Sequence, residues 1–287
     1  QGLDLPIALG ILLESEQIPK DQFELDNVYC YGSLTLKGEI QAPPDLNLLN
    51  YEDFHKKVLT GVCQESFRFP TLQLGEIQNW EEEILIKSPD TTSFEYQAPS
   101  INSEFRFDQQ TAKLMSIVAL GEHPLLLAGH AGSGKTTMVE CLAQILGPPE
   151  EKLFRESQKY WKLSDRELRS RPIVQPHHSA TPISMVGGGR PLRFGEISLA
   201  HGGALILDEL LEFHPQVQSA LREPMEKSKI QLVRVGSRKE FPADCLILGT
   251  TNLCPCGNFQ PQAPFQCRCS SLKLRNYLEK LTGPFLD

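Results

Sequence analysis

A glycine-rich stretch between an apolar run and an amphipathic helix constrains this chain more than any other feature. The stretch is GHAGSGKT, residues 129–136, and it satisfies the pattern G-x-x-x-x-G-K-[ST]. Glycines let the backbone curl so that successive N–H groups point inward at a helix start, where the helix dipole also favours negative charge. The pattern therefore predicts a phosphate-binding loop in which Lys135 reaches the β and γ phosphates of a nucleotide. The candidate nucleotide-binding residues are Gly129, His130, Ala131, Gly132, Ser133, Gly134, Lys135, Thr136 and Thr137.

Two later apolar runs end in the polar groups that such a loop requires. GALILDE ends in Asp208 and Glu209, and CLILGTTN ends in Asn252. Continuous apolar runs of this length are typical of buried parallel strands, and open α/β folds bind ligands at the carboxyl ends of those strands. We expect Asp208 and the Thr136 hydroxyl to hold Mg²⁺. We expect Glu209 to act as the base that polarises the attacking water, and Asn252 to position that water, with Lys135 as the third catalytic group.

The order of the patterns predicts the fold and the domains. Amphipathic helices at 109–123 and 135–149 alternate with the apolar runs, which predicts a doubly wound α/β sheet over residues 104–287. Residues 1–87 begin with a helical pattern, LPIALGILLES, and a strand-like stretch with a turn, VYCYGSLTLKGEIQ, which indicate a smaller α+β region. Proline-rich and serine-rich breakers place a linker at 88–103.

Composition narrows the class of protein. The formal net charge of -8 argues against a protein that coats nucleic acid through its overall charge, although a local basic patch still has that capacity. No run approaches the roughly 18 apolar residues of a membrane span, and no secretory signal stands at the start. We expect a cytoplasmic protein without a membrane partner. The chain opens at Gln1 inside an apolar run, so we interpret it as a fragment.

A basic segment interrupts this acidic chain between the acidic pair and Asn252. From Arg222 to Lys239 there are six basic residues against two acidic ones. IQLVRV followed by GSRKE is typical of a strand that runs into a turn. Two interpretations stay open, a phosphate-contacting hairpin and a merely solvated one.

Four of the eight cysteines form two Cys-x-Cys pairs separated by ten residues. A disulfide would need an oxidising compartment. A structural zinc site would need four converging thiolates, which a ten-residue connection allows, although Cys-x-Cys is tighter than the usual ligand spacing. We favour zinc and leave free thiols and disulfides as alternatives. The four residues are Cys254, Cys256, Cys267 and Cys269.

A phosphate-binding loop, an acidic pair and a polar strand tip in this order are typical of AAA+ ATPases, with Asn252 at the sensor-1 position. The stretches PHHSATPISMVGGG, GEISLAHGGALILDELLEF, LREPMEKSKIQLVR and LTGPFLD narrow the match. From about residue 103 to 287 the chain resembles the magnesium-chelatase-like YifB/ComM family. Many members of that family also carry cysteine pairs at this place. More faintly, LDLPIALGIL and YGSLTLKGEI are similar to part of a Lon-protease-like (S5-like) α+β domain. Asp4 or its neighbours stand where a Lon nucleophile would be, so we do not expect proteolysis.

The resemblance implies an ATP- and Mg²⁺-dependent motor that assembles as a homo-hexameric ring. In ComM-like proteins this motor is a helicase-like branch-migration enzyme for incoming DNA, with single-stranded or branched DNA as the partner. An inserted hairpin before sensor 1 would face the pore and contact DNA through Arg234, Arg238 and Lys239. The alternatives are an ATPase subunit that drives metal insertion through a partner, and a nucleotide-gated assembly platform.

Two departures from the family pattern affect these expectations. After Ile40 the chain continues QAPPDLNLL and not the family's Arg-Pro-Val-Arg-Gly, so the region 1–87 is expected to be a divergent, partial domain. The family's arginine finger and helical lid follow GPFLD, and the chain stops at Asp287. Because an arginine finger is worth about a thousandfold or more in rate, we expect this chain alone to bind nucleotide better than it hydrolyses it.

Overall fold

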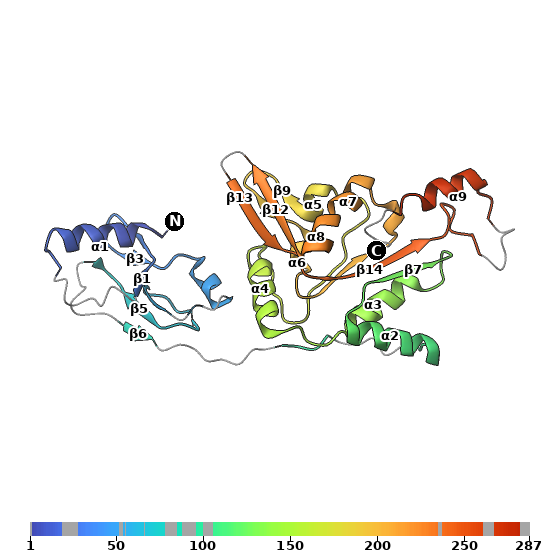
Figure 1. Cartoon of the computed structure of the whole chain (residues 1–287). Coiled ribbons are helices and arrows are strands. Elements are labelled where there is room, and N and C mark those ends of the chain that lie inside the picture. Colours follow the sequence, from blue (N-terminus) through green and yellow to red (C-terminus); the bar gives the residue numbers. More distant parts are fainter. Residues whose placement is uncertain are drawn as a thin grey trace. The chain divides into compact units, whose positions relative to one another are not determined.

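A computed structural model gives two compact units, residues 1–94 and 95–287 (Figure 1). The unit boundary falls inside the expected linker, of which only residues 96–99 lie within the described part. The family-specific stretch GPFLD lies outside it. The structure describes residues 2–18, 28–51, 54, 56–65, 67–77, 85–87, 96–99, 106–234, 237–260 and 267–281.

The first unit packs a helix on a mixed sheet. The strand order is β1-β4-β5-β6, in which β1, β4 and β5 are parallel and β6 is antiparallel. Helix α1 buries Leu5 and Leu9 against the strands. The helix and the β2–β3 hairpin match the sequence expectation, whereas β4, β5 and β6 were not predicted. The elements are α1 (Asp4–Glu14), β1 (Val28–Cys30), β2 (Ser33–Leu34), β3 (Ile40–Gln41), η3 (Leu46–Tyr51), β4 (Lys57–Gly61), β5 (Thr71–Leu74) and β6 (Leu85–Lys87).

The second unit is the predicted α/β core. Its central sheet has the order β7-β14-β11-β8, and each neighbouring pair is parallel. Its elements are α2 (Gln109–Gly121), β7 (Leu125–Gly129), α3 (Lys135–Ile145), α4 (Glu151–Lys162), β8 (Ile173–Val174), α5 (Pro182–Val186), β9 (Gly187–Gly188), β10 (Arg193–Phe194), α6 (Glu196–Leu199), β11 (Ala204–Leu207), η5 (Leu210–Glu212), α7 (Pro215–Ala220), α8 (Arg222–Lys227), β12 (Lys229–Arg234), β13 (Ser237–Pro242), β14 (Leu246–Asn252) and α9 (Ser271–Leu278).

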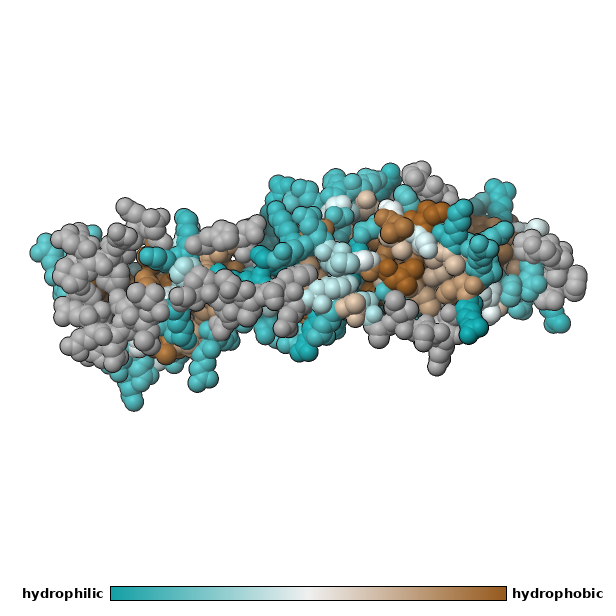
Figure 2. Space-filling view, turned by 90° about the horizontal axis from the view of Figure 1, so that it is seen from below, coloured by the Kyte–Doolittle hydropathy of each residue, from teal (hydrophilic) through white to brown (hydrophobic). Residues whose placement is uncertain are grey.

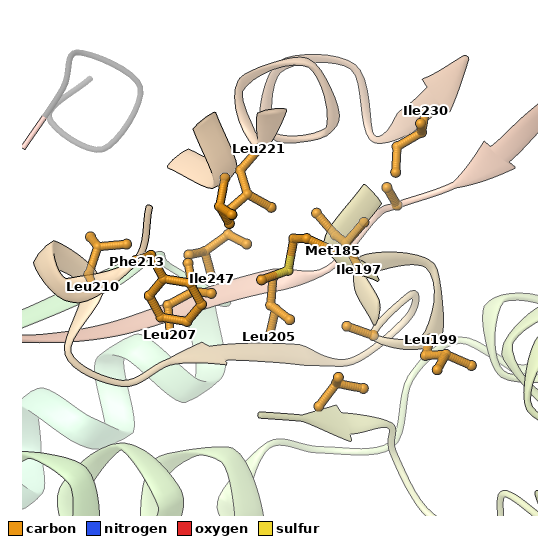
Figure 3. Close-up of a cluster of buried hydrophobic side chains, with 14 residues drawn as sticks. Met185, Ile197, Leu199, Leu205, Leu207, Leu210, Phe213, Leu221, Ile230 and Ile247 are labelled. Atoms are coloured by element: carbon orange, nitrogen blue, oxygen red, sulfur yellow. The ribbon is translucent and has the colours of Figure 1, made fainter. Parts of the chain in front are cut away.

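Strand β11 shows why this sheet is buried on both faces. Successive side chains of a strand point to opposite faces. Ala204 and Ile206 accordingly join the core beneath α2 and α3. Leu205 and Leu207 join the opposite core, where they meet Met185 and the residues labelled in Figure 3. A continuous apolar run is therefore what this position in the sheet demands.

The outer surface of the second unit also carries apolar side chains. Helix α2 lies at the bottom of the unit in Figure 1 and exposes Leu114, Ile117 and Leu120. The view from below shows brown, apolar areas on this unit (Figure 2). Among the described residues, no helix has both the length and the apolar character needed to cross a bilayer.

The basic segment forms an antiparallel hairpin of β12 and β13. The predicted hairpin is confirmed, but the turn was expected to extend too far, because residues 237–240 of the stretch GSRKE are part of a strand that pairs with β12. Strand β13 ends at Pro242 and β14 begins at Leu246, so the hairpin joins β14 at the end away from Asn252 (Figure 1).

Candidate nucleotide site

Three strand ends bring the predicted site residues to one edge of the sheet. In the register of β14 with β7, Asn252 lies opposite Gly129, the first residue of the glycine-rich loop. In the register of β14 with β11, Gly249 lies opposite Leu207, the residue before Asp208. Parallel pairing therefore aligns the ends of these strands, which are far apart in the sequence.

The glycine-rich loop has the backbone of a phosphate cradle. Gly132 and Gly134 have φ values of 77° and 80°, a left-handed conformation that glycine adopts without steric cost. A Cβ on either residue would meet no atom within 4 Å, so the loop faces open space. Helix α3 begins at Lys135 without a side-chain cap, which leaves its first N–H groups available to an anion. This loop fits the triphosphate tail of a nucleotide.

The other predicted residues of the loop bond locally. The Ser133 hydroxyl donates to the His130 carbonyl oxygen at 2.8 Å, and the His130 Nδ1 lies 2.8 Å from the Ala131 carbonyl oxygen. Thr137 is half-buried in α3.

The Lys135 ammonium group lies inside this cradle. Its Nζ donates to the carbonyl oxygens of Gly129 at 3.1 Å and His130 at 2.8 Å, and to Asn252 Oδ1 at 3.2 Å. Burial lowers the pKa of Lys135, while the carboxylates of Asp208 and Glu209 act in the opposite direction. The lysine thus joins the loop to the end of β14 by a hydrogen bond, and the carboxylates that follow β11 act on it through their charge.

A network of oxygen atoms suited to a hard cation surrounds Asp208. Its Oδ1 accepts hydrogen bonds from the Thr136 hydroxyl at 2.8 Å and from the Thr250 hydroxyl at 2.5 Å. Mg²⁺ is bound in proteins through one or two carboxylates together with phosphate oxygens and waters. The donor set therefore fits a Mg²⁺ ion shared with phosphate.

Thr250 was missed from the sequence, because it stands inside an apolar run and has no motif. Its buried hydroxyl donates to Asp208 and accepts from the backbone N–H of Glu209 at 3.0 Å. One side chain on β14 thereby fixes both members of the acidic pair that follows β11.

Glu209 has an unusual backbone for a residue with a side chain. Its φ of 53° lies in the left-handed region, which costs a non-glycine residue about 1–3 kcal/mol and persists only where neighbours enforce it. The bond from its N–H to Thr250 supplies part of that restraint. Asn252 Nδ2 lies 3.5 Å from Glu209 Oε1, at the outer limit of a hydrogen bond, and so connects the proposed base to the lysine.

Helix α9 contacts the segment that follows the acidic pair. Lys280 Nζ donates to the Leu211 carbonyl oxygen at 3.1 Å and lies 5.3 Å from the centre of the Tyr277 ring. Tyr277 is buried, and burial together with the nearby Glu212 raises the pKa of its hydroxyl. No pattern in the sequence predicts this contact, since it joins two segments 69 residues apart.

The four paired cysteines converge. Their sulfur atoms all lie within 4.8 Å of one another, with Cys254 and Cys256 at 3.3 Å and Cys256 and Cys267 at 3.7 Å. A tetrahedron with Zn–S bonds of about 2.3 Å has edges of about 3.8 Å, so these separations fit a four-thiolate zinc site. Every cysteine of the chain is a free thiol in the structure.

The electrostatics of the cysteine cluster favour one negative sulfur. Hydrogen bonding from the Asn258 backbone N–H, with help from Cys254, lowers the pKa of Cys256 to about 6. The hydrogen bond between the Cys256 and Cys269 side chains raises the pKa of Cys269. A divalent cation would remove this conflict, because it favours deprotonation of every ligand.

The basic hairpin presents its predicted DNA-contacting residues on different faces. Leu232 lies opposite Lys239, on the face that also carries the buried Ile230 and Phe241. Arg238 lies on the other face, exposed, and its Nη2 donates to Gln231 Oε1 at 2.7 Å. The side chain of Arg234 lies outside the described residues. The structure thus separates Arg238 from Lys239, two residues that the sequence grouped together.

Comparisons with known proteins cover almost the whole chain. A family model described as magnesium chelatase, subunit ChlI, matches residues 103–287. The uncharacterized protein YifB of Salmonella typhimurium is 32% identical over 305 residues, covering 99% of this chain and 58% of the relative. The competence protein ComM of Haemophilus influenzae is 29% identical over 306 residues, covering 99% of this chain and 59% of the relative. The chain therefore spans less than two thirds of the length of these curated relatives.

A solved structure of NtrX from Brucella abortus in complex with ATP matches with a TM-score of 0.38 and 19% identity, over 64% of this chain and 38% of that one. The family model covers well over half of the chain, and the relatives agree with the resemblance drawn from the motifs. The chain belongs to the magnesium chelatase subunit ChlI family of AAA+ ATPases, within the group that contains YifB and ComM.

Proposed function

We propose that this chain carries the Mg²⁺-dependent, ATP-hydrolysing core of a ring-forming motor that acts on DNA. The observation that carries the proposal is the meeting of Lys135, Thr136, Asp208, Glu209 and Asn252 at one sheet edge, joined by hydrogen bonds. Such a set contains a phosphate-binding cation, a metal-binding carboxylate and a base, which are the parts that phosphoryl transfer to water needs.

Each residue has a separate task in this proposal. The loop N–H groups and Lys135 bind the phosphates, while Thr136 and Asp208 would hold Mg²⁺, which supplies charge neutralisation when bound. The Glu209 carboxylate orients a water and accepts its proton, and Asn252 holds that carboxylate at the correct angle. Thr250 keeps Asp208 and Glu209 in register.

Assembly into a homo-hexameric ring follows from the family and not from a contact in this chain. In a ring, each nucleotide site lies beside a neighbouring subunit, from which an arginine stabilises the transferring phosphate. Turnover is therefore a property of the assembled, full-length protein. We place this motor in the cytoplasm, where reducing conditions keep thiols free.

Two observations support DNA as the substrate. The relative ComM is named a competence protein. The hairpin of an otherwise acidic chain exposes Arg238 and Lys239, which is the local charge that phosphate contacts require. Branch migration, with single-stranded or branched DNA as the partner, is the activity that would use both.

The cysteine cluster is proposed to hold a structural Zn²⁺. Four converging sulfurs close the coordination shell, so no position is left for a substrate. The site therefore shapes the loop after Asn252 and does not take part in chemistry.

The test is ATP turnover by the full-length protein with and without forked DNA. We expect stimulation by DNA, and its loss when Arg238→Ala and Lys239→Ala are combined. The matched control combines Arg169→Ala and Lys227→Ala, which removes one arginine and one lysine from exposed positions outside the hairpin. Equal rates with and without DNA contradict the DNA motor.

A second candidate is an ATPase subunit that drives metal insertion, which the description of the family model favours. This function predicts an ATP turnover rate that is the same with and without DNA and that rises with a partner subunit recovered by pull-down. A nucleotide-gated platform predicts tight ATP binding with negligible turnover in the intact ring. The same turnover assay thus separates the three functions.

A further inference from the structure

The cysteine loop begins almost inside the nucleotide site. Asn252 ends β14 and contacts Lys135, and only Leu253 separates it from Cys254. Cys254 is buried, and its sulfur accepts a hydrogen bond from the Phe259 backbone N–H at 3.2 Å. The first cysteine pair therefore starts where the sheet edge ends.

The same loop then touches the phosphate-binding loop. The Gly257 carbonyl oxygen accepts a hydrogen bond from the Ala131 backbone N–H at 2.7 Å. Gly257 is buried and has a φ of 76°, and a Cβ there would lie 2.9 Å from the Ala131 Cβ. Only glycine meets both demands, the left-handed backbone and the close approach.

The contact matters because, among the hydrogen bonds described for Ala131 to Gly134, it is the one that leads outside the loop and helix α3. Ala131 to Gly134 are exposed, and Gly132 and Gly134 have open space beside them. The bond from Ala131 to Gly257 joins this loop to a segment far away in the sequence. It aligns the strand-proximal half of the cradle before nucleotide arrives, and preorganisation of this kind raises affinity.

The cysteine loop in turn has little regular structure of its own. Between β14 and α9, the described residues 253–260 and 267–270 belong to no helix or strand. Gly257 is held by its N–H, which donates to the Cys254 carbonyl oxygen at 3.0 Å, and by its position directly after Cys256. Ligation of all four sulfurs would fix the turn from Cys254 to Gly257, since both members of the first pair lie within it.

We propose that the four-cysteine cluster is a positioning element of the nucleotide site: metal ligation fixes the Gly257 carbonyl oxygen, and that oxygen holds the phosphate-binding loop through Ala131. The inference rests on the proposed function, because it assumes that the loop binds nucleotide. It adds that nucleotide affinity depends on a metal that never contacts the nucleotide. Gly257 is the positioning residue, and the cysteines act through it.

The first experiment measures the Kd of a fluorescent ATP analogue for the full-length protein, with its metal content measured in parallel by a colorimetric zinc assay. Mg²⁺ is kept in excess, a phosphine reductant keeps the thiols reduced, and a soft-metal chelator removes Zn²⁺. We expect Kd to rise about tenfold on stripping, equivalent to about 1.4 kcal/mol, and to return when Zn²⁺ is added back. An unchanged Kd in protein that has lost its zinc overturns the inference.

The second experiment separates the contact from the metal. Gly257→Ala leaves all four sulfurs in place, so it is expected to retain zinc and to weaken nucleotide binding by a similar factor. Cys256→Ser, at the exposed ligand, is expected to lose both zinc and affinity. Cys63→Ser is the matched control, since Cys63 lies in the other unit and is not one of the four clustered cysteines. If Gly257→Ala binds nucleotide as tightly as the parent protein, the inference is wrong.

The outcomes also distinguish this inference from the proposed function. Lys135→Met removes the phosphate-binding cation and should raise the nucleotide Kd roughly 10- to 150-fold with or without zinc. If the zinc-loaded parent protein fails to bind nucleotide, the proposed function fails. If the zinc-loaded protein binds nucleotide and its Kd changes neither on chelation nor in Gly257→Ala, only the positioning role fails. Thermal unfolding of each variant shows whether a weaker Kd reflects a changed loop or a lost fold.

Discussion

The carboxyl edge of the central sheet and the β12–β13 hairpin hold their polar side chains by different means. At the sheet edge, Asp208 accepts hydrogen bonds from two threonine hydroxyls, and Asn252 lies between a lysine and a glutamate. At the hairpin, Arg238 and Lys239 are exposed, and Arg238 is restrained by Gln231 on its own ribbon.

The difference indicates where each region's function resides. Half-buried groups that hydrogen-bond one another depend on their partners, because a group that loses its partner keeps its share of the desolvation cost without compensation. Exposed charges are screened by solvent and act nearly independently. Substitutions at the edge should therefore have large and coupled effects, and substitutions at the hairpin should have small and additive ones.

The largest effect is expected from Glu209→Gln, which keeps the shape of the side chain and removes the base. General-base catalysis contributes about 10²–10⁴-fold, so turnover by the full-length protein should fall by that factor while nucleotide Kd changes little. Single-turnover ATP hydrolysis and a binding titration measure the two quantities. If the variant hydrolyses ATP at the parent rate, Glu209 is not the base. The contrast between large effects at the sheet edge and small effects at the hairpin would then fail.

Next in size is Lys135→Met, which removes a positive charge from the centre of the edge network. Hydrogen bonds to charged groups are worth about 1.5–3 kcal/mol, so nucleotide Kd should rise roughly 10- to 150-fold. Isothermal titration with ATP provides the measurement. Lys113→Met, on the exposed face of α2, is the matched control and should leave Kd unchanged. Similar behaviour of the two variants would place the phosphate site elsewhere.

A third substitution sharpens the comparison within the fold itself. Thr250→Val removes a buried hydroxyl that serves Asp208 and the Glu209 N–H, so unfolding free energy should fall by about 1–3 kcal/mol. Thr60→Val makes the same change at another buried threonine, whose hydroxyl has no hydrogen-bond partner among the described residues. That control should be neutral or stabilising. Denaturant unfolding measures the free energy of unfolding of both variants. Equal losses would mean that the hydrogen bonds of Thr250 do not stabilise the fold.

These cases also explain how far the sequence could predict the molecule. The loop at residues 129–136, the acidic pair and the apolar strands are local patterns, and their chemistry and their parallel pairing could be inferred together. The fold and the family were confirmed. The structure brings the predicted residues to one edge, where their catalytic roles stay predictions.

What escaped prediction depends on contacts between distant segments. Thr250 gains its role only when β14 pairs with β11, and Gly257 only when its loop reaches Ala131. Strands β4, β5 and β6 were missed because they are short and lie among proline-containing breakers. The stretch GSRKE was taken for a turn because Gly-Ser is typical of one, although residues 237–240 pair with β12 as part of a strand.

The smallest effect is expected at the hairpin, from Arg238→Ala alone. Loss of one phosphate contact should weaken binding of forked DNA several-fold and uniformly across sequences, and it should reduce the slope of log K against log salt by about one unit. Fluorescence anisotropy over a series of salt concentrations measures both. Because Arg238 and Lys239 occupy different faces of the ribbon, the single substitutions should act on binding additively, unlike pairs at the sheet edge. An unchanged salt slope would show that Arg238 contacts no phosphate, and strong coupling between the two residues would show that the hairpin presents one joint surface.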